Sequence, residues 1–195
     1  MPTHPRERMI QSALVLMGEH GVEGTSFSQV IEHSGAPRGS IYHHFPGGKA
    51  QLVEEATRYA GDTAAKIATD AVERHEDDPV AALDAIVGFW RTVLYNSDFA
   101  AGCPVIAASL EGDRTPAARE AAREAFARWE DLYTEVLQRA GVPEERARSL
   151  GSIAISAVEG AVILSRAERS NAPLERAVDE LHRLFHDAID EAKKS

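Results

Sequence analysis

The chain has 195 residues, of which 21 are basic and 31 acidic, so its formal net charge is −10 at pH 7. A chain of this length can bury a real core, and its single cysteine, Cys103, excludes an intrachain disulfide and fits a reducing compartment. The first residues do not have the pattern of a secretory signal, and the longest weakly charged stretch, Ser149–Ser165, falls short of the ~18 apolar residues typical of a membrane span. We therefore expect a cytoplasmic protein without a membrane partner.

The negative charge is unevenly distributed along the chain. Residues 1–50 carry four of the basic and four of the acidic residues, so the whole net charge of −10 falls on residues 51–195. A neutral head beside an acidic body permits contact with a polyanion through the head alone.

The first fifty residues have the pattern of three helices. A first helix is expected over residues 5–20, where Met9, Ala13 and Leu16 recur with helical spacing. A second begins after Ser26, whose spacing to Gln29 is that of a capping box, and it ends at a glycine suited to a left-handed C-cap.

A third, shorter helix starts after Pro37, places Ile41 and Phe45 inward, and stops at the Pro-Gly-Gly run of residues 46–48. Two short helices joined by a tight turn and supported by a longer one are typical of a helix-turn-helix. An ordinary helical hairpin inside a bundle is the alternative. In a helix-turn-helix the second short helix reads DNA, and it would expose Arg38, Gly39, Ser40, Tyr42, His43 and His44.

The rest of the chain also has helical periodicity. A long helix is expected over residues 49–75, and further helices at residues 80–97, 103–112, 116–140, 144–169 and 173–192. The sequence therefore predicts an all-α protein of about nine helices.

The run from Ser34 to Lys49, Ser-Gly-Ala-Pro-Arg-Gly-Ser-Ile-Tyr-His-His-Phe-Pro-Gly-Gly-Lys, closely resembles the signature of TetR-family regulators. Its residues are similar to those of the LmrA/YxaF branch of this family, and so are Gly102-Cys103-Pro104 and Glu159-Gly160. The resemblance implies a helix-turn-helix DNA-binding domain at residues 1–50 and an effector-binding and dimerisation domain at residues 51–195. It also implies a homodimeric regulator, a repressor released from a palindromic double-stranded operator by a small apolar or aromatic effector, with no cofactor and no enzymatic activity.

The resemblance assigns phosphate contacts to Tyr42 and Lys49, and a phenol and an ammonium suit that role. Arg38 is the candidate base reader, because its guanidinium can take guanine O6 and N7 together. Gly39 would let the backbone approach DNA closely. The remaining candidates are Ser40, His43 and His44, which could contact bases or phosphate, and Ser26 and Ser28, which either bind phosphate or only cap their helix.

In the body, the resemblance implies an effector pocket and dimerisation through the last two helices. Most of the large aromatic residues lie in the middle helices, where each could equally be plain core. The candidate effector-binding residues are Phe89, Trp90, Phe99, Cys103, Phe126, Trp129, Tyr133 and Glu159. The candidate dimer-interface residues are Leu150, Val158, Val162, Leu181, Leu184 and Phe185.

Other classes fit less well. Gly48-Lys49 is not a phosphate loop, because that motif needs a glycine where His43 stands and a hydroxyl where Ala50 stands. His182 and His186 share a helix face but have no third ligand nearby in sequence, so no metal site is expected. A thiol-based redox sensor using Cys103, at a predicted helix start, is the alternative function. An adaptor that uses its helices only for protein contacts is a further one.

Overall fold

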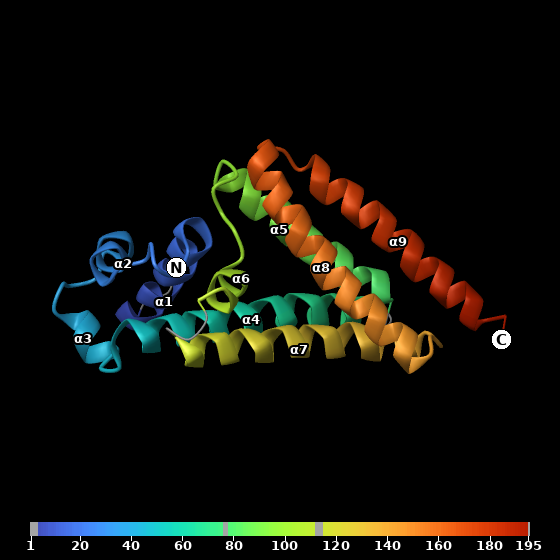
Figure 1. Ribbon diagram of the computed structural model, residues 1–195, viewed down its shortest axis with the longest axis horizontal. Coiled ribbons are helices and arrows are strands. Elements are labelled where there is room, and N and C mark those ends of the chain that lie inside the picture. The colour runs from blue at the N-terminus through green and yellow to red at the C-terminus, as the bar shows by residue number, and fades with distance from the viewer. Residues whose placement is uncertain (1–3, 76–77, 112–114, 195) are drawn as a thin grey trace. The chain divides into compact units, whose positions relative to one another are not determined.

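The computed structural model describes residues 4–75, 78–111 and 115–194, and the helices that follow are those within these ranges. It has no strand there, so the all-α prediction is confirmed (Figure 1). The helices are α1 Pro5–His20, α2 Phe27–Ser34, α3 Ser40–His44, α4 Gly48–Arg74, α5 Pro79–Asn96, α6 Pro104–Ser109, α7 Pro116–Arg139, α8 Glu144–Glu168 and α9 Ala172–Ala192. Most bounds agree with the predicted ones to within two residues. The exception is α6, which ends three residues before the predicted end at residue 112, itself outside the described residues.

Local sequence signals set these bounds. The capping box is present: the Ser26 side chain accepts a hydrogen bond from the Gln29 amide, and the Gln29 side chain accepts one from the Ser26 amide. At the other end of α2, Gly35 adopts the left-handed conformation (φ 62°, ψ 22°) that ends a helix at little cost only for glycine. Proline stands in the first turn of several helices, where its missing amide leaves no hydrogen bond unmade.

Two compact units make up the chain, and each is built from two stretches of sequence. The first contains the described residues of 1–62 and 102–125, and the second those of 63–101 and 126–195. Helices α4 and α7 each begin in the first unit and end in the second. The domain boundary predicted at residue 50 concerns which residues bind which ligand. This packing does not test it, so it stays a prediction.

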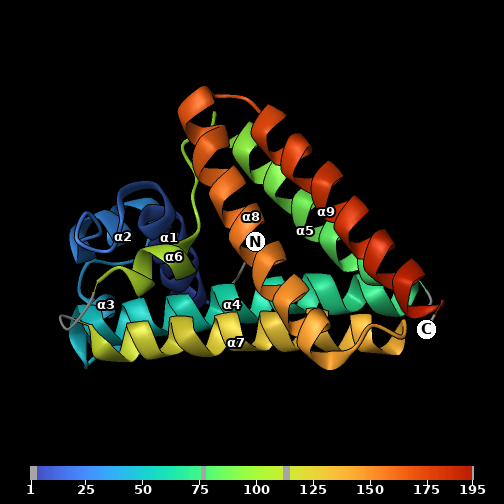
Figure 2. The ribbon, with the colours of Figure 1, turned by 45° about the vertical axis from the view of Figure 1, so that its right-hand side comes forward.

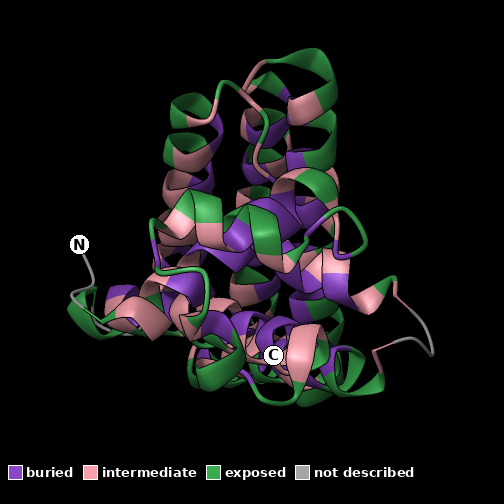
Figure 3. Ribbon diagram, turned by 90° about the vertical axis from the view of Figure 1, so that its left-hand side faces the viewer, coloured by how far each residue is buried: buried purple, intermediate pink, exposed green. Residues whose placement is uncertain are grey.

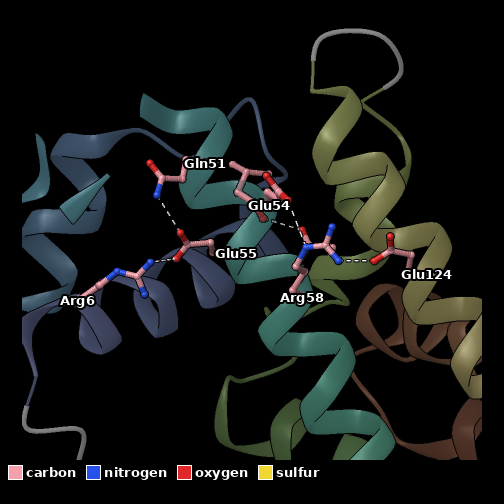
Figure 4. A network of polar contacts seen from close by, with 8 residues as sticks. Arg6, Gln51, Glu54, Glu55, Arg58 and Glu124 are labelled. Atoms are coloured by element: carbon pink, nitrogen blue, oxygen red, sulfur yellow. Dashed lines mark hydrogen bonds and ion pairs between the residues drawn. The ribbon is translucent and has the colours of Figure 1, made fainter. Parts of the chain in front are cut away.

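The core of the first unit lies between α1 and the short helices. Met9, Met17, Ile41, Phe45 and Leu52 are fully buried. Helix α1 packs against α2, α3 and α6, and α7 joins the same unit through an ion pair between Glu124 and Arg58 of α4 (Figure 4).

The contact of α1 with α6 is unusually close. A Cβ atom added to Gly18 of α1 would stand well inside van der Waals contact of the Gly102 carbonyl oxygen, just before α6. Only a residue without a side chain fits at Gly18 in this arrangement.

The second unit is organised around α5, α8 and α9, which pack against one another (Figure 2). Leu83, Leu150, Leu174 and Leu181 are fully buried between them. Polar contacts also join α5 to α9. Arg91 donates two hydrogen bonds to Glu175, over 2.7 and 2.8 Å, and a His182 ring nitrogen lies 2.8 Å from an Asp84 carboxylate oxygen.

Burial follows one side of the helices, as their amphipathic sequences predict (Figure 3). Among the described helices, α8 alone is long and apolar enough, by length and composition, to cross a bilayer. Because 44% of that apolar stretch is buried inside the protein, it matches the core helix of a globular unit equally well.

Candidate functional site

The polar end of the first unit is formed by α2, the turn after it, and α3. Helix α3 has only five residues, too few to be stable in isolation, so its position depends on its buried anchors. Ile41 is 0% exposed and Phe45 is 1% exposed, and both belong to the core shared with Val30 of α2. With these side chains held inward, the polar residues around α3 lie at the surface.

Four predicted DNA-binding residues are exposed there, namely Arg38, Gly39, Tyr42 and His43. The Tyr42 side chain is 69% exposed although it is aromatic. Arg38 has no ion-pair partner among the residues that the structure describes, so its guanidinium is available. His44 is half-buried, and its ring meets that of His43 at 62° rather than facing the same way.

Ser40 and Gly39, at the start of α3, differ in their local contacts: Ser40 forms a side-chain hydrogen bond, and the surroundings of Gly39 are open. The Ser40 hydroxyl donates a 2.7 Å hydrogen bond to the Pro37 carbonyl oxygen, so its proton is already used. Gly39 has ordinary helical torsion angles (φ −78°, ψ −16°), and an added Cβ would meet no atom within 4 Å. Nothing in the fold of this chain therefore requires glycine at position 39.

The predicted phosphate ligands outside α3 are placed as follows. Ser26 is the N-cap of α2 and its hydroxyl also donates to the Gln29 side chain over 2.7 Å, so its capping role is confirmed. Ser28 is exposed as the second residue of the same helix. The Lys49 ammonium, at the start of α4, donates a long 3.4 Å hydrogen bond to the Glu23 carbonyl oxygen.

Sequence reasoning missed two groups of residues at this end of the molecule. The ring of Phe27, the first residue of α2, contacts that of Tyr42, with centroids 5.6 Å apart. Arg6 of α1 reaches Phe45 and Glu55 beyond α3. Both are contacts between helices, and helical periodicity carries no information about which helices meet.

The structure places five of the candidate effector residues in ring pairs. Phe89 contacts Trp90 on α5, Phe126 contacts Trp129 on α7, and Tyr133 contacts Phe185 of α9. Trp90, Tyr133 and Glu159 are buried, and burial raises the pKa of the Tyr133 phenol, with the Asp84 charge adding to the effect.

The other two candidates lie near the end of α5 and the start of α6. Phe99 follows α5 with a positive φ of 61°, which is rare for a residue with a side chain. Cys103 is the half-buried N-cap residue of α6 and belongs to the first unit, whereas the other seven candidates belong to the second.

The residues predicted for the dimer interface stay a prediction, because burial within one copy of the chain does not test which residues a second copy contacts. Five of the six are buried within a single copy of the chain, at 5% exposure or less, and Leu184 is half-buried; the five are Leu150, Val158, Val162, Leu181 and Phe185. Their stripe packs α8 and α9 against each other and against α5 instead of facing outward. The apolar side chains that α8 does leave exposed are Ile153, Ile163 and Leu164.

Two known families match successive parts of the chain. The family described as "Bacterial regulatory proteins, tetR family" matches residues 9–56, which contain α2, α3 and most of α1. The family described as "Transcriptional regulator LmrA/YxaF-like, C-terminal domain" matches residues 79–180, from the start of α5 into α9.

Individual proteins agree over nearly the whole chain. An uncharacterised HTH-type transcriptional regulator of Mycobacterium tuberculosis is 42% identical, covering 93% of this chain and 94% of its own. The HTH-type transcriptional regulator LmrA of Bacillus subtilis is 32% identical, covering 87% and 90%. The crystal structure of a TetR transcriptional regulator from Legionella pneumophila superimposes with a TM-score of 0.84 at 22% identity, covering 93% and 97%. The chain therefore belongs to the TetR family of DNA-binding transcriptional regulators, with an LmrA/YxaF-like C-terminal domain.

Proposed function

We propose that this regulator is a cytoplasmic repressor that binds a palindromic operator as a homodimer and leaves it when a small apolar or aromatic effector binds. The observation that carries the DNA part is the surface around α3. Ile41 and Phe45 anchor the helix, while Arg38 and Tyr42 stand exposed beside a glycine that the fold does not need.

Each exposed group has a chemical role in this proposal. Arg38 reads a guanine, since its fork matches O6 and N7 in the major groove. Tyr42 and Lys49 hold phosphates, and Lys49 exchanges its long bond to the Glu23 carbonyl for that contact. The residues proposed to contact bases or phosphate nearby are Ser26, Ser28, Ser40, His43 and His44.

The proposed DNA site is tested by selecting bound duplexes from a random library with the wild-type protein. We expect a palindrome, because a dimer with two identical heads recognises two identical half-sites about one helical turn apart. Arg38→Ala should weaken binding to the selected duplex by about 1–3 kcal/mol and relax the preference at one base pair per half-site. Lys49→Ala should weaken binding to selected and shuffled duplexes alike and flatten the salt dependence. If Arg38→Ala lost affinity equally on both duplexes, Arg38 would not be a base reader.

The proposed dimer forms through α8 and α9. The interface stripe predicted from the sequence stays a prediction, and we propose that the exposed Ile153, Ile163 and Leu164 of α8 take part beside it. Contiguous exposed apolar patches commonly mark interaction surfaces, and we propose that these side chains belong to one.

The proposed effector binds in the second unit, near the aromatic pairs of α5 and α7. An effector that favours a form with weaker operator affinity must itself bind less tightly when the operator is present, and by the same factor. Tryptophan fluorescence of Trp90 and Trp129, titrated with and without the selected duplex, measures this factor. A ligand with equal affinity in both titrations is not the inducer. The redox alternative, which would act through Cys103, stays a prediction.

A further inference from the structure

Arg6, in the first turn of α1, lies against the far end of the DNA-reading helix. Its guanidinium carbon is 5.3 Å from the centroid of the Phe45 ring, and Phe45 is the residue at which α3 ends. The same guanidinium forms an ion pair with Glu55 of α4. An arginine over an aromatic face is attracted by the ring, and a carboxylate partner fixes its direction.

Glu55 extends this contact to the turn between α3 and α4 (Figure 4). One carboxylate oxygen accepts from Arg6, and the other accepts a 3.0 Å hydrogen bond from the Gln51 side chain. The side-chain oxygen of Gln51 in turn accepts a 2.8 Å hydrogen bond from the backbone amide of Gly47, which lies in the turn itself. Arg6 therefore contacts the C-terminal end of α3 directly, through the Phe45 ring. It is also linked to the turn after α3 through Glu55 and Gln51.

The two ends of α3 are held by different means. At its start, the Ser40 hydroxyl and amide both donate to the Pro37 carbonyl oxygen, three residues earlier, so these contacts are local. At its end, the Phe45 amide closes the helix on Ile41, and side chains from other helices, Arg6 of α1 with Glu55 and Gln51 of α4, contact Phe45 and the turn that follows. A helix of one turn is not stable without tertiary contacts, so a displacement of its C-terminal end moves the whole helix.

We propose that Arg6 is a positioning residue for operator recognition, which sets the angle of α3 through Phe45 and the Glu55–Gln51 pair without contacting DNA. This inference rests on the proposed role of α3 as the reader. Its rival is that Arg6, a half-exposed cation close to that surface, is itself a phosphate ligand.

The two roles predict opposite effects at Glu55. If Arg6 positions α3, removing Glu55 weakens the contacts at the C-terminal end of the helix, and operator binding becomes weaker. If Arg6 binds phosphate, removing Glu55 frees the guanidinium and takes away a negative charge near DNA, so binding strengthens. Glu7, exposed in the same first turn of α1, provides a charge-matched control.

The experiment measures fluorescence anisotropy of a duplex selected from a random library with the wild-type protein, and of a shuffled duplex, over a salt series. The variants are Arg6→Ala, Glu55→Ala, the double variant, Gln51→Ala and Glu7→Ala. We expect Arg6→Ala and Glu55→Ala each to weaken binding to the selected duplex on the order of tenfold. We expect the double variant to lose no more than either, Gln51→Ala to shift affinity in the same direction, and the salt slope to stay as in the wild type.

Tighter or unchanged binding by Glu55→Ala, together with a salt slope about one lower in Arg6→Ala, would overturn the proposal in favour of a phosphate contact. Equal losses on selected and shuffled duplexes would overturn it as well, because a change in the angle of α3 acts on base recognition. Circular dichroism of each variant separates these outcomes from unfolding, and Gln51→Ala leaves Arg6 and its two contacts in place. Failure of the reader proposal itself is recognised separately, by an Arg38→Ala variant that keeps its sequence preference.

Discussion

The rings of Phe27 and Tyr42 meet edge to face, with centroids 5.6 Å apart and planes 70° apart. This contact joins the first residue of α2 to the exposed face of α3, and it restricts a tyrosine whose side chain is otherwise 69% exposed. In the proposed complex, where Tyr42 holds a phosphate, the Phe27 contact would limit the rotamers of Tyr42 before DNA binds.

We expect Tyr42→Phe, which removes only the hydroxyl, to weaken binding to selected and shuffled duplexes equally, because phosphate contacts carry no sequence information. Phe27→Leu should produce part of the same loss by freeing the ring. Anisotropy titrations of the two variants and of their combination check this. Additive losses in the combined variant would show that Phe27 acts on DNA binding independently of Tyr42.

Gly39→Ala separates a requirement of DNA binding from a requirement of the fold. Its torsion angles and open surroundings accept a methyl group, so the free energy of unfolding should change by less than about 1 kcal/mol. If the backbone approaches DNA closely at this position, the methyl group should weaken binding to both selected and shuffled duplexes. Gly88 of α5, where an added Cβ also meets no atom within 4 Å, is the control, and Gly88→Ala should bind as the wild type does. Wild-type affinity in Gly39→Ala would rule out the close approach.

Gly18→Ala should behave in the opposite way. The added Cβ would collide with the Gly102 carbonyl oxygen, which is backbone and cannot rotate away. We expect the free energy of unfolding to fall by about 1–3 kcal/mol, as for other overpacked cores. Thermal unfolding measures it, and an unchanged melting temperature would mean that α1 and α6 separate at little cost.

The exposed apolar residues of α8 give a test of the dimer. Ile163 and Leu164 are 57% and 54% exposed, so glutamate at either position should dissociate the dimer while leaving each copy folded. Leu181→Glu should instead unfold the protein, because Leu181 is 1% exposed within one copy. Sedimentation at micromolar concentration, read beside circular dichroism, distinguishes the two results. A monomeric wild type would contradict the proposed dimer directly.

The contact between α5 and α9 predicts a dependence of stability on pH. Hydrogen bonds from Arg91 lower the pKa of Glu175. A carboxyl with a lowered pKa stabilises the fold above its unfolded pKa of about 4.3, and this stabilisation is lost as the pH falls through the lower folded value. Glu175→Gln should lower the free energy of unfolding at neutral pH by no more than about 1 kcal/mol, since both side chains are nearly half exposed.

Urea unfolding of wild type and Glu175→Gln at a series of pH values checks this expectation, and the gap between them should close in acid. Glu180→Gln, which breaks a pair with Arg183 inside α9 alone, is the control. A gap that stayed constant with pH would assign the effect to packing rather than to the charge.

The helices could be predicted because their ends are marked locally. The Ser26 cap, Gly35 and the prolines at helix starts each act within a few residues, so sequence alone located them. The family signature similarly named the surface around α3, including Arg38 and Tyr42.

What could not be predicted depends on which helices meet. Helix α8 is apolar on several sides, and no periodicity says which of them a neighbouring helix covers. Val162 is buried inside one copy while its neighbours Ile163 and Leu164 are exposed, so periodicity alone did not single out these two exposed side chains. The contacts of Arg6 with Phe45 and Glu55 could not be predicted either, because they join residues far apart in sequence.

The tight meeting of Gly18 with Gly102 has a consequence for how the protein is made and how it can be re-engineered. Residues 63–101, which belong to the second unit, separate the two stretches of the first. At a synthesis rate of about 5–20 residues per second, the α1 surface around Gly18 leaves the ribosome seconds before the segment that covers it. The first unit therefore completes its core only after much of the chain has emerged. A chimera that transplants residues 1–62 onto another body would leave this surface uncovered, whereas one that also carries residues 102–125 brings the segment that packs on it.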